Sequence, residues 1–265
     1  MLKTRVISAC VFVPVILLAV FFGSWLFAAL MTAIAVIGGY EYGKMVEVNG
    51  FRFFSWIYYP AAVLLIVLAQ LCVATPGILL SVLFLAFGVL ITLFILGKEA
   101  IDDVCVNLLA VVYIPVTLAT GVLLRSGFAE GMWLLYLLLI IEWFTDSGAY
   151  FIGSAIGKHK LMPKVSPKKS VEGAVGGILA AVIGAVVLNI FTDLLPMGLM
   201  IFMAIVVSIG GQLGDLCESA IKRWAGVKDS GTLIPGHGGV LDRFDSMLFA
   251  APLIYLFLCV YQLFN

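Results

Sequence analysis

Apolar stretches long enough to form membrane-spanning helices recur along the whole chain, separated by short polar segments. A helix needs about 20 mainly apolar residues to cross the roughly 30 Å of hydrocarbon in a bilayer. The pattern predicts an all-α, polytopic integral membrane protein with about nine transmembrane helices, and residues 1–265 are expected to form a single membrane domain. The stretches lie at approximately 7–22, 25–41, 55–74, 78–97, 104–124, 132–152, 173–191, 197–220 and 246–263.

Composition and charge agree with a membrane location. Hydrophobic residues make up 63% of the chain and charged residues 11%, whereas about 25% of the residues in a soluble domain are charged. With a cytoplasmic N-terminus, the alternating loops place 14 of the 15 Lys and Arg residues on the cytoplasmic side and only Arg125 outside. This positive-inside bias predicts a cytoplasmic N-terminus and, for an odd number of spans, a C-terminus outside.

The two halves of the chain differ in polarity. Residues 1–130 carry few polar groups within their spans and are interpreted as a mainly hydrophobic scaffold. Beyond them, ionisable residues enter the spans, and two cytoplasmic loops exceed the usual connection of about 4–6 residues. We therefore expect residues 131–265 to provide the catalytic helices and loops.

The span at 132–152 ends with two acidic residues on one helix face. Glu142 and Asp146 are four residues apart, with Ser147 beside them. Ionisable residues at membrane depth are costly and usually functional. We interpret the group as functional, with carboxylates that merely reach the membrane interface as the alternative.

The span at 197–220 carries a polar stripe. At about 100° per residue, five polar side chains fall on one narrow face, with Glu218 flanking them. We interpret this seam as functional, although a water-lined transport path gives the same pattern. The five are Ser208, Gln212, Asp215, Ser219 and Lys222.

Glycines four residues apart recur in the second half. Such pairs let membrane helices approach closely, so we predict a packing role for them. The pairs are Gly153 and Gly157, Gly173 and Gly177, and Gly210 and Gly214.

A segment before the last span, KDSGTLIPGHGGVLDRFDS, combines glycines, a histidine and acids. Gly238 and Gly239 leave backbone N–H groups accessible to phosphate oxygens, and His237 can donate or accept a hydrogen bond there. Asp242 and Asp245 are three residues apart and would share one face of a helix that begins nearby. Helix capping is the alternative, and it explains one aspartate more easily than the whole group.

Three aspartates, Asp215, Asp242 and Asp245, supply the hard oxygen ligands that Mg²⁺ prefers. Together with basic residues and a glycine loop, they indicate chemistry on a polyphosphate. Neither a GxxxxGK[ST] loop nor a strand-linked GxGxxG motif is present, so the familiar soluble nucleotide-binding folds are not indicated. The basic residues are Lys222, Arg223, Lys228 and Arg243.

A second cytoplasmic loop, GKHKLMPKVSPKKSVEG, is strongly basic. Ser170 can cap the helix that follows, with Glu172 in its first turn, and Lys168 and Lys169 can face a lipid phosphate. A loop that only sets topology and touches anionic lipid is an equally good interpretation.

The segment SAIKRWAGVKDSGTLIPGHGGVLDRFDS, residues 219–246, resembles the signature of the phosphatidate cytidylyltransferase (CDP-diacylglycerol synthase) family. The family pattern runs S-x-x-K-R, then K-D, then H-G-G, then D-R-x-D, and every position matches. DSGAYFIGSAIGKHKL and SPKKSVEG also resemble family segments, with Ser170 where threonine is common. The first half of the chain is similar only as a hydrophobic scaffold.

The resemblance implies transfer of CMP from CTP to phosphatidic acid, giving CDP-diacylglycerol and pyrophosphate in phospholipid biosynthesis. It also implies nine helices per subunit, a homodimer, and a centre with Mg²⁺ and a second, monovalent cation held by Asp215, Asp242 and Asp245. The expected catalytic residues, which position phosphate and stabilise charge, are Lys222, Arg223, Lys228, His237 and Arg243. The expected substrate-binding residues are Asp146, Ser147, Lys168, Lys169, Ser170, Glu172, Gln212, Ser219, Gly238 and Gly239.

Because CTP is cytoplasmic, the active site is expected on the cytoplasmic face of a bacterial inner membrane, and no nucleic-acid partner is expected. Three alternatives stay open. A lipid-binding scaffold would use only the basic loops, and a CTP-dependent polyprenol kinase would need the same nucleotide, metal and lipid groove. A cation or proton transporter would use relay carboxylates at Glu142, Asp146, Asp215 and Glu218.

Overall fold

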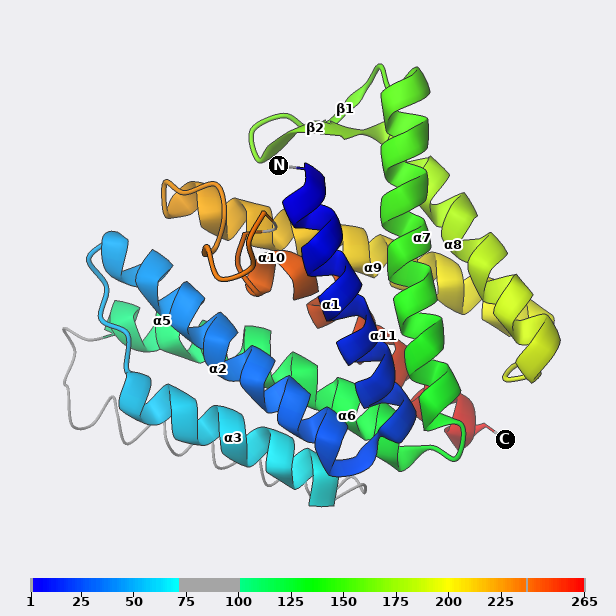
Figure 1. The fold of residues 1–265 in the computed structure, drawn as a ribbon, viewed down its shortest axis with the longest axis horizontal. Helices are drawn as coiled ribbons and strands as arrows, with labels where there is room; N and C mark the ends of the chain where they lie inside the picture. Colours follow the sequence, from blue (N-terminus) through cyan, green and yellow to red (C-terminus); the bar gives the residue numbers. More distant parts are fainter. Residues whose placement is uncertain (1, 72–100, 237, 265) are drawn as a thin grey trace. The chain divides into compact units, whose positions relative to one another are not determined.

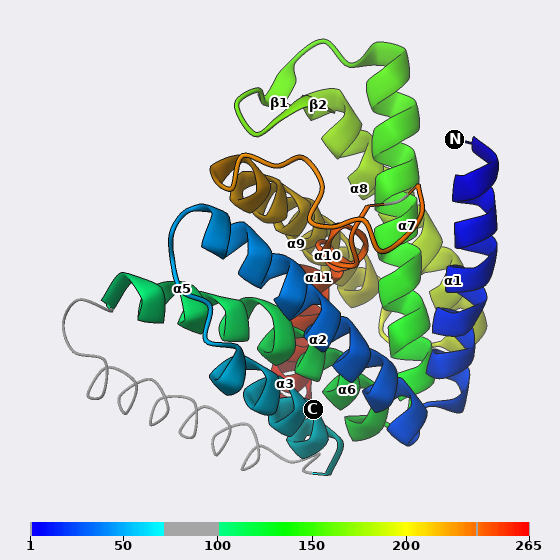
Figure 2. The ribbon, with the colours of Figure 1, turned by 60° about the vertical axis from the view of Figure 1, so that its left-hand side comes forward.

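The computed structural model describes residues 2–71, 101–236 and 238–264, which are predominantly helical (Figures 1 and 2). A π-helical turn at Val112–Val116 contains Pro115, whose missing N–H disturbs regular helical hydrogen bonding. The helices are α1 (Leu2–Phe22), α2 (Ser24–Val48), α3 (Ser55–Leu71), α5 (Ile101–Val111), α6 (Thr117–Gly127), α7 (Gly131–Ile156), α8 (Val171–Thr192), α9 (Met197–Trp224), α10 (Leu241–Phe244) and α11 (Met247–Leu263).

Six helical segments in the described part of the chain are long and apolar enough to cross a membrane, and two shorter apolar helices accompany them. The protein is therefore a multi-pass, mainly α-helical membrane protein, as predicted. Each predicted span within the described residues coincides with a helix. The span at 78–97, the end of the span at 55–74, and His237 lie outside those residues. The total of nine spans and the orientation of the termini stay predictions.

The chain packs as two compact units. The first unit consists of Met1–Ala129 and Trp224–Arg243, and the second of Glu130–Arg223 and Phe244–Asn265. One boundary between the units lies near residue 130, and the expected single membrane domain over residues 1–265 stays a prediction. The glycine-containing segment before the last span nevertheless packs mostly with the first unit.

In the first unit, α2 packs closely against α3. The Tyr58 hydroxyl donates to the Ala35 carbonyl at 3.0 Å, and a methyl group at Gly39 would collide with the Tyr58 ring. This contact excludes any residue larger than glycine from position 39 of α2. It holds α2 firmly in the unit to which the glycine-containing segment also belongs.

In the second unit, α7 and α8 lie side by side in both ribbon views (Figures 1 and 2). A Cβ atom built on Gly173 would lie 2.8 Å from the Ala149 carbonyl oxygen, and one on Gly177 would lie 2.7 Å from that of Thr145. On α9, a Cβ atom at Gly214 would lie 2.6 Å from the Asp245 carbonyl oxygen. The predicted packing role is confirmed for Gly173, Gly177 and Gly214.

An antiparallel hairpin, β1 (Lys160–Met162) and β2 (Ser166–Ser170), stands between α7 and α8. The sequence predicted only a basic loop there, because strands this short and this charged show no alternation of apolar and polar positions. The hairpin ends directly at α8, so its last residues are fixed relative to that helix.

Candidate functional site

The polar stripe of α9 faces the interior of the second unit. The hydroxyl oxygens of Ser208 and Thr145 are 2.7 Å apart, and the Gln212 side-chain amide donates to the Ala174 carbonyl at 3.2 Å. Ile209, off the stripe, is exposed. The predicted seam is therefore a face of α9 that meets protein.

Asp215 lies on this stripe and is bound from two directions. The Lys169 ammonium group, at the end of β2, forms an ion pair with Asp215 Oδ2. The Ser219 hydroxyl donates to Asp215 Oδ1 at 3.3 Å. The structure thus brings together an expected metal ligand and two expected substrate-binding residues.

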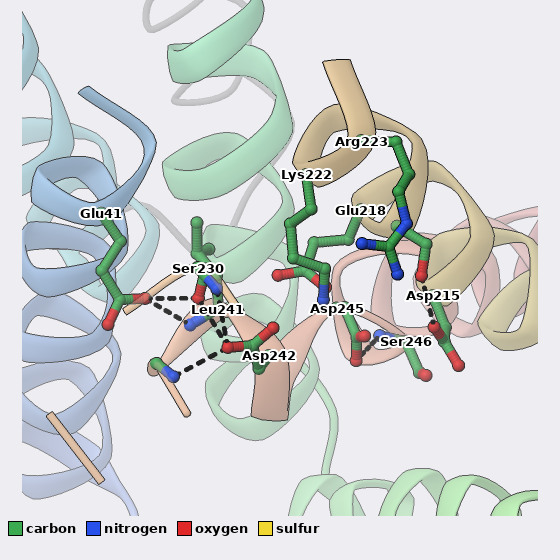
Figure 3. Close-up of polar contacts among 12 residues, drawn as sticks. Glu41, Asp215, Glu218, Lys222, Arg223, Ser230, Leu241, Asp242, Asp245 and Ser246 are labelled. Carbon is green, nitrogen blue, oxygen red and sulfur yellow. Dashed lines mark hydrogen bonds and ion pairs between the residues drawn. The ribbon is translucent and has the colours of Figure 1, made fainter. Parts of the chain in front are cut away.

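Lys222 lies two turns beyond Asp215 on α9. It forms an ion pair with Glu218, whose side chain is fully buried (Figure 3). The neighbouring Arg223 is exposed, and its Nε donates to the Val165 carbonyl at 3.3 Å. The charge on Lys222 is therefore locally compensated, whereas Arg223 lies at the surface of the second unit beside the hairpin.

Asp245 adds a third carboxylate to this region. The charged groups that act on it are Asp215, Glu218 and Lys222. Within the described part of the second unit, three carboxylates thus gather with the ammonium groups of Lys222 and Lys169. We call these three carboxylates the acidic cluster. Carboxylates placed this close to one another favour a bound cation.

Glu142 and Asp146 lie close enough for their charges to interact, but their surroundings differ. Glu142 is buried against α9, where a methyl group at Gly211 would collide with its carboxylate. Asp146 and Ser147 are exposed. The two carboxylates differ in surroundings because the face of α7 at Glu142 packs against protein.

The start of α8 is organised by the basic loop. The Gly173 N–H donates to Ser170 Oγ at 3.1 Å, which confirms the predicted helix cap. Glu172 accepts backbone hydrogen bonds from Lys158 and His159, at 3.1 and 3.2 Å, and pairs with His159 Nδ1 at 2.6 Å. Ser170 and Glu172 therefore fix the junction of hairpin and helix.

Asp242 belongs to the first unit and collects hydrogen bonds from the loop that precedes it (Figure 3). Its Oδ2 accepts from the Ser230 N–H at 2.9 Å, the Ser230 hydroxyl at 3.0 Å and the Gly239 N–H at 2.8 Å. Gly238 has φ +86°, and a Cβ atom there would lie 2.6 Å from Asp242 Oδ2. The Gly239 N–H, expected to face phosphate, binds this aspartate in the structure.

A second acid, Glu41 of α2, binds the same loop. Its Oε1 accepts from the Val240 N–H at 2.9 Å, and its Oε2 accepts from the Leu241 N–H at 2.9 Å. Oε2 also lies 3.0 Å from the Ser230 hydroxyl, whose single proton it shares with Asp242 Oδ2. Glu41 is only 3% exposed. Neither Glu41 nor Ser230 was among the predicted site residues. The available signal was an acid within an apolar span, which is costly unless it has a use.

The remaining predicted basic residues lie at the surface. Lys168, Lys228 and Arg243 are exposed, and His237 is outside the described residues. An apolar cavity of about 440 Å³ lies beside the same loop in the first unit, lined among others by Ile34, Leu233 and Pro235. The loop therefore lies beside both charged side chains and an apolar cavity.

The donor chemistry of the aspartates fits Mg²⁺. The acidic cluster offers oxygen ligands, as a hard divalent cation requires. Among the described residues, no group of three or more His, Cys, Asp or Glu side chains is already arranged to hold a metal ion. Asp242 lies in the first unit and Asp215 and Asp245 in the second, so their convergence stays a prediction.

Comparison with known proteins defines the class. Residues 3–261 match the model of the cytidylyltransferase family, and the chain belongs to this family. A phosphatidate cytidylyltransferase of Staphylococcus haemolyticus is 36% identical over 264 residues, and one of Staphylococcus aureus (strain COL) is 35% identical over 262 residues; each match covers 96% of both chains. One of Bacillus subtilis is 33% identical over 186 residues, 69% of both chains.

Proposed function

We infer that the protein is an enzyme that transfers CMP from CTP to phosphatidic acid, giving CDP-diacylglycerol and pyrophosphate. The observation that carries this inference is the family match along residues 3–261, with relatives of that activity at 33–36% identity. A multi-pass membrane protein with a polar seam in one helix suits a reaction between a lipid headgroup and a water-soluble nucleotide.

The reaction joins two anions. A phosphate oxygen of phosphatidic acid forms a bond to the α-phosphorus of CTP, the bond from that phosphorus to the α–β bridging oxygen breaks, and pyrophosphate leaves. Because the nucleophile is already anionic, it needs no strong general base. The enzyme must instead hold the two substrates in line and compensate their charge.

The chain's own basic residues can perform both tasks. Exposed Arg223, Lys228 and Arg243 can bind phosphate oxygens, and a guanidinium group can do so with two parallel hydrogen bonds. Lys222 is held by Glu218 and presents a fixed ammonium group. Lys169 can exchange its contact with Asp215 for a substrate phosphate. His237 is proposed as a further phosphate contact.

We propose that Asp215, Asp242 and Asp245 hold Mg²⁺, with a second, monovalent cation nearby. Bound Mg²⁺ would neutralise phosphate charge and polarise the α-phosphoryl group. The proximity of Asp215 and Asp245 in the acidic cluster supports this assignment. We also propose that the site faces the cytoplasm at the inner membrane and that the protein is a homodimer. The distribution of basic residues supports the first proposal and the family resemblance the second.

A labelled-substrate assay tests the function. The purified protein is incubated with phosphatidic acid and CTP labelled at either the α- or the γ-phosphate, with and without Mg²⁺. We expect only the α-label to enter lipid, and only with Mg²⁺. Entry of the γ-label would identify a lipid kinase, and cation flux without label transfer would identify a transporter.

A further inference from the structure

Glu41 joins the predicted scaffold to the loop that carries the reaction's expected groups. It comes from α2, in the first half of the chain, yet all three of its hydrogen-bond donors belong to residues 230–241. A buried carboxylate is costly unless donors such as these, or a positive charge, compensate it. Glu41 and the loop therefore stabilise each other's placement.

The arrangement requires a carboxylate rather than any polar side chain of the same shape. Both Glu41 oxygens accept from backbone N–H groups, Oε1 from Val240 and Oε2 from Leu241. A glutamine would have to turn its NH₂ group toward one of these two donors, whichever way the amide is flipped. The isosteric substitution thus replaces at least one hydrogen bond by a repulsive contact.

The same loop atoms connect Glu41 to Asp242. The Ser230 hydroxyl lies 3.0 Å from Glu41 Oε2 and 3.0 Å from Asp242 Oδ2 (Figure 3). A Cβ atom at Gly239 would collide with Ser230 and would lie 2.5 Å from Glu41 Oε2, so the space between the two acids is filled. A shift of the Glu41 carboxylate would therefore shift Ser230 and, through it, Asp242.

We propose that Glu41 is a positioning residue: it holds residues 230 and 238–241 in the conformation in which Asp242 meets the metal and nucleotide phosphates. The proposal rests on the proposed function for its catalytic consequence. Its structural half, control of the loop by Glu41, is independent of any activity. Outer groups that orient a metal ligand typically change metal affinity or activity by about 10- to 100-fold when removed.

The test compares Glu41→Gln with Glu47→Gln, an exposed glutamate on the same helix, in the full-length protein. Amide hydrogen exchange is measured over residues 228–242 and over α7, together with the Mg²⁺ dependence of CMP transfer. For Glu41→Gln we expect about tenfold faster exchange in the loop only, transfer reduced about 10- to 100-fold and a higher Mg²⁺ midpoint. Glu47→Gln should match the wild type.

A merely structural role would lower the melting temperature and the folded fraction without moving the Mg²⁺ midpoint, and that result would overturn the proposal, as would unchanged exchange in the loop. If Glu41→Gln does not fold, Ser230→Ala, which removes the hydroxyl shared by both acids, must shift the midpoint in the same direction. Failure of the proposed function is recognised separately, because the wild type itself would then transfer no α-label.

Discussion

Asp242 and Asp245 are three residues apart in the sequence, but hydrogen-bond donors surround the first and other carboxylates surround the second. Asp242, in the first unit, accepts three hydrogen bonds from Ser230 and Gly239. Asp245, in the second, belongs to the acidic cluster with Asp215 and Glu218. A carboxylate surrounded by donors also fixes the conformation of the chain around it, whereas one among like charges contributes mainly by favouring a cation. Identical residues in one motif therefore make different contributions to stability and activity.

The largest effect is expected from removing the Asp245 carboxylate from the acidic cluster. Asp245→Asn should lower CMP transfer by at least about 1,000-fold, because a bound metal supplies several kcal/mol of charge stabilisation. Its melting temperature should stay equal or rise, since like-charge repulsion is relieved. Label transfer and thermal unfolding in detergent measure the two quantities. Asp193→Asn, at the exposed end of α8, is the matched control; equal transfer by both variants would remove Asp245 from the site.

Asp242→Asn should reduce both the rate of CMP transfer and the stability of the protein. We expect transfer to fall by about 100-fold and the free energy of unfolding to fall by about 2 kcal/mol, because the buried Ser230 and Gly239 donors lose a charged acceptor. Unfolding curves of the two variants, Asp242→Asn and Asp245→Asn, measure the difference in their stability. A variant as stable as Asp245→Asn would show that the two surroundings do not differ in their energetic effect.

A methyl group at Gly239 tests the packing between the two acids of the first unit. The added Cβ would collide with the Ser230 hydroxyl and the Glu41 carboxylate. We expect Gly239→Ala to destabilise the protein by about 1–2 kcal/mol and to weaken Mg²⁺-dependent transfer. Gly198→Ala is the control, because a Cβ there meets nothing within 4 Å. Similar melting temperatures for the two variants would contradict the close packing.

Much of the fold was accessible from the sequence, because spans need long apolar runs and glycine pairs mark close helix contacts. Helical periodicity predicted the polar stripe of α9. The serine directly before α8 predicted the helix cap at Ser170. Glu41 was missed because its partners are almost 200 positions away, and no local pattern reports such a pairing. The hairpin was missed because its strands are too short to show periodicity.

The smallest effect is expected at the start of α8, where the predicted cap and a predicted substrate contact coincide in Ser170. Loss of a helix cap costs about 1 kcal/mol, so Ser170→Ala should lower the melting temperature by a few degrees, while Ser154→Ala, in an exposed position on α7, should not. If Ser170 only caps the helix, the Michaelis constant for phosphatidic acid is unchanged. If it also binds the lipid phosphate, that constant rises in Ser170→Ala and returns toward the wild-type value in Ser170→Thr, because threonine keeps the hydroxyl for both roles.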